Sequence, residues 1–88
     1  MNKLISALEE TLSYLWRSES SDYSHTSVNE IIVKLESEIT KAKNAQSIDK
    51  RQLSLLFAPT GAIQETSIDN GWSEEYLKTS EVVDQYTK

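Results

Sequence analysis

Two pairs of adjacent carboxylates, Glu9-Glu10 and Glu74-Glu75, are the first candidates for acid–base chemistry in this sequence. Catalysis by two carboxyl groups requires that both converge on one substrate and that their surroundings differ. Neighbouring residues on a helix diverge by about 100°, and neither pair is embedded among apolar residues. We therefore interpret both pairs as solvated helix residues, and Glu74 and Glu75 also suit the first turn of a helix, where the backbone dipole favours negative charge.

The sequence offers even fewer candidate residues for nucleophilic catalysis or metal binding. His25 is the only histidine, the chain has no cysteine, and catalysis or metal binding by an imidazole needs partners of these kinds. Calcium-loop, zinc-protease and glycine-rich phosphate motifs are absent from the sequence. We expect His25 to be a solvent-exposed loop residue, and we expect no enzymatic activity, metal, cofactor or small-molecule substrate.

Charge and hydropathy narrow the range of partners. The 88 residues include 14 acidic and nine basic side chains, which gives a net charge of −5 that repels phosphate backbones. Nucleic acid is therefore not expected as a partner. No apolar run approaches the roughly 20 residues of a membrane span, and the first residues lack the apolar region of an export signal. Together with the lack of cysteine, this predicts a cytoplasmic protein without membrane contact.

The elements that must position any functional residue are helices. Apolar residues recur at helical spacing over 2–17, 28–44, 50–57 and 74–86. Ser27 and Glu30 have the spacing of a capping box, and Asp49 precedes Gln52 by the same interval. Ser27 and Asp49 are therefore predicted to mark the starts of the second and third helices. On the first helix we expect Trp16 to lie inside, and on the second we expect Glu38 on the outer face.

Residues 58–72 interrupt this helical pattern. Pro59, Gly61 and Gly71 are the only proline and glycines of the chain. The sequence thus predicts an all-α fold, a single domain over residues 1–88 built as a three- to four-helix bundle with an irregular segment at 58–72. Ala62, Ile63 and Ile68 are expected to attach this segment to the bundle, and we expect one short turn of helix within it. Irregular segments on rigid scaffolds are where contacts with other molecules concentrate.

Acidic and aromatic residues gather around this segment. From residue 60 to residue 88 there are six acidic and two basic side chains. Trp72 and Tyr76 stand among Asp69, Glu74 and Glu75, a mixture typical of an interface anchor surrounded by charge. An aromatic stripe at helical spacing in so small a bundle is, however, more often part of the core. Both interpretations stay open at this point.

Residues 53–65 (LSLLFAPTGAIQE), followed by 67–72 (SIDNGW), resemble a segment of small bacterial immunity proteins. In those proteins, which include ones from contact-dependent growth inhibition, an apolar helix runs into a turn of the pattern Gly-(Ser/Ala)-(Ile/Leu)-x-(Asp/Glu). Residues 61–65 fit this pattern, with Glu65 where the family has Asp. The resemblance is confined to residues 53–72.

This resemblance implies a cytoplasmic protein that binds a cognate toxin domain stoichiometrically and blocks its active site. A nuclease toxin would present a basic cleft, and an acidic inhibitor gains fast encounter and charge complementarity against it. The expected partner-binding residues are Glu65, Asp69, Glu74 and Glu75 for charge, with Trp72 and Tyr76 as anchors. The alternative from composition alone is an acidic helical adaptor or regulatory subunit that binds an ordinary cellular protein.

Overall fold

Five helices form the described part of the chain, which in this computed structural model comprises residues 2–19, 27–59 and 61–87. The helices are α1 (Asn2–Leu15), α2 (Val28–Lys43), α3 (Lys50–Leu56), α4 (Ala62–Asn70) and α5 (Ser73–Thr87). No strand occurs within these ranges. The all-α class is confirmed, and the four predicted helices are present within about two residues of their expected ends. The prediction of three to four helices is wrong, because a fifth lies in 58–72.

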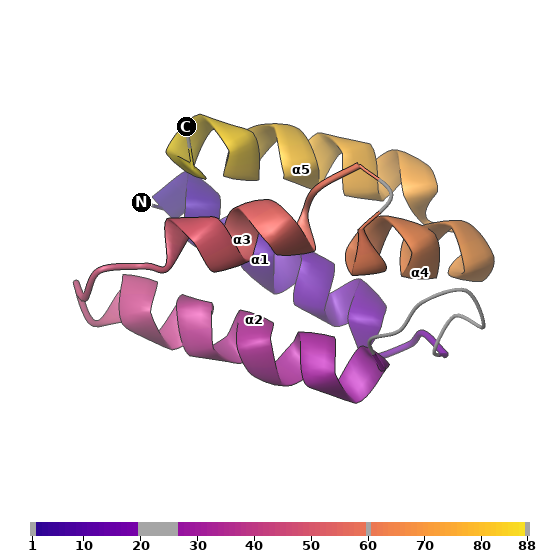
Figure 1. Ribbon diagram of the computed structural model, residues 1–88, viewed down its shortest axis with the longest axis horizontal. Coiled ribbons are helices and arrows are strands. Elements are labelled where there is room, and N and C mark those ends of the chain that lie inside the picture. The colour runs from indigo at the N-terminus through magenta and orange to yellow at the C-terminus, as the bar shows by residue number, and fades with distance from the viewer. Residues whose placement is uncertain (1, 20–26, 60, 88) are drawn as a thin grey trace.

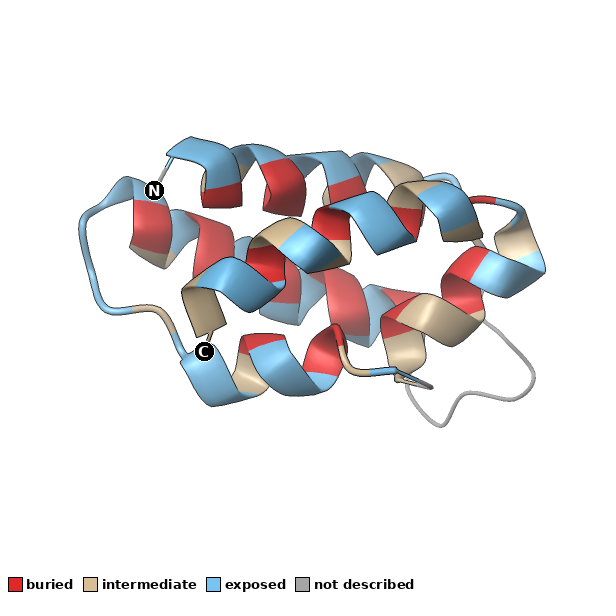
Figure 2. Cartoon of the chain, turned by 90° about the horizontal axis from the view of Figure 1, so that it is seen from above, coloured by how far each residue is buried: buried red, intermediate tan, exposed pale blue. Residues whose placement is uncertain are grey.

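Helix α5 contacts three of the other four helices, α1, α3 and α4. Figure 1 shows α2 and α5 running antiparallel to α1, and α1 packs most extensively against these two helices. The shorter helices α3 and α4 each contact both α2 and α5. Figure 2 shows that the buried residues form inward stripes on the helices. The fully buried apolar side chains are Leu4, Leu8, Leu15, Ile31, Leu35, Leu53, Ile63 and Val83.

Two helices begin at the caps that the sequence predicts. The Ser27 hydroxyl accepts a hydrogen bond from the Glu30 backbone N–H at 3.2 Å, at the start of α2. The Asp49 carboxylate accepts one from the Gln52 backbone N–H at 2.9 Å, at the start of α3. Each bond satisfies a backbone donor that the helix itself leaves unpaired, which contributes about 1 kcal/mol.

The predicted irregular segment contains α4, bounded by the two glycines. Gly61 precedes the helix in an extended conformation, and a Cβ there would lie 2.8 Å from the Ala58 carbonyl oxygen. Gly71 ends the helix with φ 81°, in the left-handed region that glycine adopts most easily. The residues that interrupt the helical pattern therefore separate three helices, α3, α4 and α5.

The hydrophobic pattern did not predict α4 because its buried face is partly polar. Thr66 and Ser67 are fully buried, and their hydroxyls donate to the Ala62 carbonyl at 2.8 Å and the Gln64 carbonyl at 2.6 Å. Hydroxyls bonded to their own helix can enter a core without an unpaired polar group. Ile68, expected to attach the segment to the bundle, is instead 59% exposed.

Two further expectations are wrong. Trp16 is 63% exposed, because α1 ends at Leu15 and the half-buried Tyr14 is the aromatic residue that packs against the core. Glu38 is fully buried on the inner side of α2 and does not face outward. Its burial depends on groups from another helix, which helical periodicity within α2 does not reveal.

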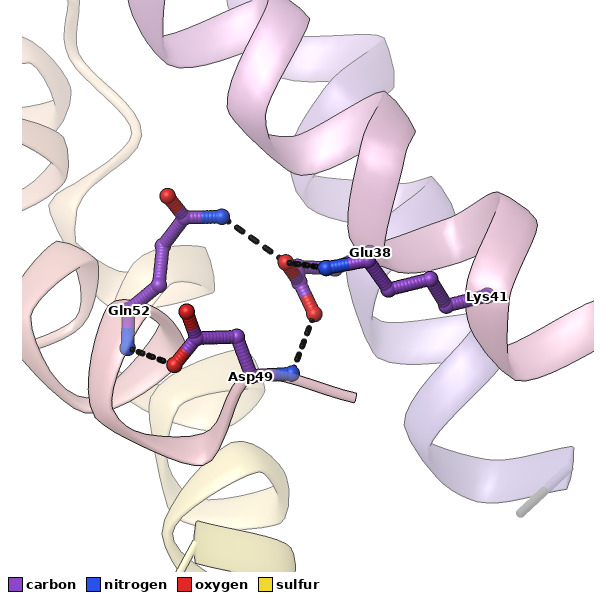
Figure 3. A network of polar contacts seen from close by, with 4 residues as sticks. All are labelled: Glu38, Lys41, Asp49 and Gln52. Carbon is purple, nitrogen blue, oxygen red and sulfur yellow. Dashed lines mark hydrogen bonds and ion pairs between the residues drawn. The ribbon is translucent and has the colours of Figure 1, made fainter. Parts of the chain in front are cut away.

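Glu38 connects α2 to the start of α3 (Figure 3). Its Oε1 accepts a hydrogen bond from the Asp49 backbone N–H at 2.7 Å, and its Oε2 accepts one from Gln52 Nε2 at 2.8 Å. Lys41 Nζ lies 3.2 Å from the same Oε2. A buried carboxylate persists only when it is bonded in this way, so these contacts fix the α2–α3 connection.

Alkaline pH should destabilise the protein through Tyr76. Its hydroxyl donates to the Phe57 carbonyl at 2.8 Å, and burial, helped by the nearby Asp84 carboxylate, raises its pKa from 10.0 to about 12. The unfolded chain releases this proton at lower pH than the folded chain, so the stabilisation is complete below pH 10 and is lost as the pH rises toward 12. We expect the free energy of unfolding, measured in urea, to fall less steeply over this interval in Tyr76→Phe. An equal decline in both proteins would contradict this assignment.

Candidate partner-binding surface

Four predicted carboxylates lie on α4 and in the first turn of α5. Glu65 and Asp69 are one helical turn apart on α4, and Glu74 and Glu75 are in the first turn of α5. We call these four residues the acidic face. Asp69 and Glu74 are exposed, whereas Glu65 and Glu75 are partly buried. The four carboxylates predicted from the sequence thus lie on two consecutive helices of the fold.

The acidic face is not neutralised within the described part of the molecule. The two ion pairs there join Lys41 to Glu38 and Lys43 to Glu9, and neither involves the acidic face. None of its four carboxylates receives a side-chain hydrogen bond from residues 2–19, 27–59 or 61–87 either. The positive ends of the helix dipoles favour Glu65, Glu74 and Glu75, each by about 0.3–1 kcal/mol. Their negative charge is otherwise available to a partner.

Gly71 sets the angle at which the two helices meet. The Trp72 backbone N–H donates to the Ser67 carbonyl at 2.9 Å, which closes the end of α4 around the left-handed glycine. A Cβ at Gly71 would meet no atom within 4 Å, so the requirement for glycine is conformational. The relative placement of Asp69 and Glu74 therefore depends on this one residue.

Trp72 belongs to the core and is not an exposed anchor. It is 5% exposed, and its ring stacks on Tyr14 with the centroids 5.2 Å apart. Its Nε1–H donates to the Ser18 hydroxyl at 2.8 Å. Tyr76 is also buried and stacks on Phe57. The fold therefore supports the interpretation of the aromatic stripe as part of the core. Trp72 and Tyr76 support the acidic face by packing against the core and do not belong to its surface.

The exposed apolar residues of this region are different ones. Ile68 lies on α4 between Glu65 and Asp69, and Leu77 lies one turn after Glu74 on α5 with 55% of its surface exposed. Sequence reasoning missed both, because their apolar character suggested burial. Exposed apolar side chains beside carboxylates are suited to contact a partner.

Asn70 ties this corner to the segment after α1. Its Oδ1 accepts from the Glu19 backbone N–H at 3.1 Å, and its Nδ2 donates to the Glu19 carbonyl at 2.9 Å and to the Thr66 carbonyl at 2.9 Å. A depression of about 260 Å³ lies next to it, lined in part by Arg17, Trp72 and Glu75. The Arg17 guanidinium lies 5.2 Å from the centre of the Tyr14 ring. The partner of Asn70 in residue 19 lies 51 positions away along the chain, so local sequence spacing does not reveal it.

Within 2–19, 27–59 and 61–87, no three or more histidine, cysteine or acidic side chains are grouped so that they could hold a metal ion. The candidate His25 lies outside the described residues. None of the helices found there combines the length and the apolar character needed to cross a membrane.

Comparison with protein-family models, with curated proteins and with solved structures gives no match for this chain.

Proposed function

We propose that this protein is an immunity protein that binds a cognate bacterial toxin domain, a nuclease with a basic active-site cleft, and blocks it by stoichiometric occlusion. The observation that carries the proposal is the acidic face: four carboxylates on two consecutive helices, without a cationic partner among the described residues. The resemblance of residues 53–72 to immunity proteins supplies the class of partner.

Electrostatics gives the acidic face two roles in this mechanism. Long-range attraction between the carboxylates and a basic cleft raises the association rate, by roughly tenfold to a thousandfold in steered complexes. In the complex, Glu65, Asp69, Glu74 and Glu75 occupy positions that substrate phosphates would take. No catalysis by the inhibitor is required for this.

The apolar part of the contact is assigned to Ile68 and Leu77. Because Trp72 and Tyr76 are covered, they support the surface and do not insert into the partner. Burying an exposed isoleucine or leucine side chain contributes about 1.5–3 kcal/mol. Ile68, flanked by Glu65 and Asp69, is therefore the expected anchor, with the carboxylates as its charged rim.

Charge reversal tests the proposal. The double variant Glu65→Lys, Asp69→Lys is mixed with the toxin domain encoded beside this gene, and association is followed by surface plasmon resonance. We expect the association rate constant to fall about a hundredfold at low salt, because steering is lost. The difference from the native protein should shrink as salt increases.

A matched variant controls for net charge. Glu10→Lys, Glu36→Lys changes two exposed carboxylates on α1 and α2 by the same amount and should retain most of the native association rate. Lack of a complex between the native protein and the toxin, in size-exclusion chromatography at micromolar concentrations, would contradict the proposed function. Equal losses in both double variants would contradict the assignment of the acidic face.

A further inference from the structure

A second depression lies between α2, α3 and the start of α4. Its volume is about 360 Å³, within the range of about 300–1,000 Å³ typical of ligand sites. Apolar side chains from Leu55, Leu56 and Ala62 and the basic side chains of Lys34 and Arg51 line it. We call these five residues the basic groove. The basic groove shares no residue with the acidic face.

The apolar part of the basic groove is open to a partner. Leu55 is 64% exposed, although it lies in the apolar run 53–57 (LSLLF). Leu56 beside it is buried and packs into the core. Leu56 thus fixes one wall of the groove to the core, and Leu55 leaves a side chain that another molecule can cover. Burying the Leu55 side chain would contribute about 1.5–3 kcal/mol to the free energy of binding.

The two cations of the basic groove outnumber the one carboxylate that lines it, that of Asp49. Neither Lys34 nor Arg51 takes part in an ion pair with any residue of the described ranges, although Glu30 precedes Lys34 by one helical turn. The Asp49 carboxylate, also at the groove, accepts the capping hydrogen bond of α3. In a chain with a net charge of −5, the groove is thus a local site of the opposite sign.

The walls of the basic groove are held rigidly. Glu38, buried beneath its edge, fixes the start of α3 by accepting hydrogen bonds from Asp49 and Gln52, which both line the depression (Figure 3). At the other end, the Gly61 backbone N–H donates a hydrogen bond to the Ala58 carbonyl oxygen at 2.9 Å. A groove that is already ordered loses little conformational entropy when it binds.

We propose that the basic groove binds an acidic amphipathic segment of a partner protein, which places an apolar side chain on Leu55 and carboxylates against Lys34 and Arg51. The apolar wall favours a peptide over a nucleic acid, since phosphates gain nothing from leucine. This site is independent of the toxin contact assigned to the acidic face.

The test uses the full chain and a fluorescein-labelled synthetic helix of leucine and glutamate, with leucines at positions i, i+3, i+4 and i+7. Fluorescence anisotropy should show saturable binding with a Kd on the order of 10 μM, a value typical of a small and transient contact. A peptide with lysine in place of each glutamate should not bind. Raising the salt concentration should weaken the binding of the acidic peptide.

Substitutions locate the binding. Arg51→Glu and Lys34→Glu should each weaken the affinity about tenfold, and Leu55→Ala should weaken it by a similar factor. Lys78→Glu makes the same change of charge on α5, away from the basic groove, and should stay within about twofold of the native protein. All four residues are exposed, so circular dichroism melting should confirm that each variant is folded.

Three results would overturn this proposal. The first is a lack of saturable peptide binding, or an equal loss of affinity in Lys78→Glu. The second is tighter binding of a single-stranded DNA oligonucleotide that Arg51→Glu abolishes. The third is self-association of the protein that Arg51→Glu abolishes, since this would assign the groove to a second copy. Because toxin binding depends on other residues, failure here leaves the Glu65→Lys, Asp69→Lys comparison unaffected.

Discussion

Replacement of Glu38 by alanine is expected to lower the free energy of unfolding by about 3 kcal/mol, a large part of the stability of a domain of this size. Glu38 is fully buried and accepts hydrogen bonds from the Asp49 backbone N–H and from Gln52 Nε2. Without the carboxylate, these donors lose their partner and a small cavity remains. The same change should loosen the start of α3. Urea unfolding monitored by circular dichroism measures the effect.

Glu36 provides the matched control for this experiment. It lies two residues earlier on α2 but is exposed, so Glu36→Ala should change the free energy of unfolding by less than about 0.5 kcal/mol. If Glu38→Ala were no more destabilising than Glu36→Ala, the hydrogen bonds of Glu38 would contribute nothing to stability. That result would contradict the role of Glu38 in fixing the α2–α3 connection.

Replacement of Trp72 by alanine is expected to cost about 3–5 kcal/mol, the range for removal of a large buried aromatic side chain. The loss combines its stacking on Tyr14 with the hydrogen bond from its indole N–H to Ser18. Trp72→Phe keeps an aromatic ring but not the hydrogen bond, so its cost should be about 1–2 kcal/mol. Thermal and urea unfolding of the variants give these values.

Trp16 is the control, because it is the same residue type in an exposed position. Trp16→Ala should change the free energy of unfolding by less than about 0.5 kcal/mol. A larger cost for Trp16→Ala than for Trp72→Ala would reverse the assignment of which tryptophan is buried.

Much of the fold follows from the sequence because α1, α2, α3 and α5 carry regular apolar stripes. The caps at Ser27 and Asp49 were likewise predictable, since a capping bond joins residues only three apart. The helix α4 was not, because Thr66 and Ser67 take buried positions where apolar residues are expected. Hydrogen bonds from their hydroxyls to carbonyls of their own helix make this burial possible. A prediction from hydrophobic periodicity does not take such hydrogen bonds into account.

The candidate site was predictable in its charge but not in its anchors. The carboxylates of the acidic face are visible as an excess of acidic residues, two of them within the predicted irregular segment 58–72 and two just after it. Burial of Trp72 depends on Tyr14 and Ser18, more than fifty residues away along the chain. Exposure of Ile68 depends on how α4 lies on α5. Tertiary contacts of this kind leave no trace in local spacing.

Amide hydrogen exchange of the protein, alone and mixed with the toxin domain encoded beside its gene, tests the central claim most directly. Exchange should slow on α4 and on the first turn of α5, around Asp69 and Glu74, while the exposed side of α2 stays unchanged. Slowing confined to α1 or α2, or no change at saturating toxin, would contradict the assignment of the acidic face as the toxin-binding surface.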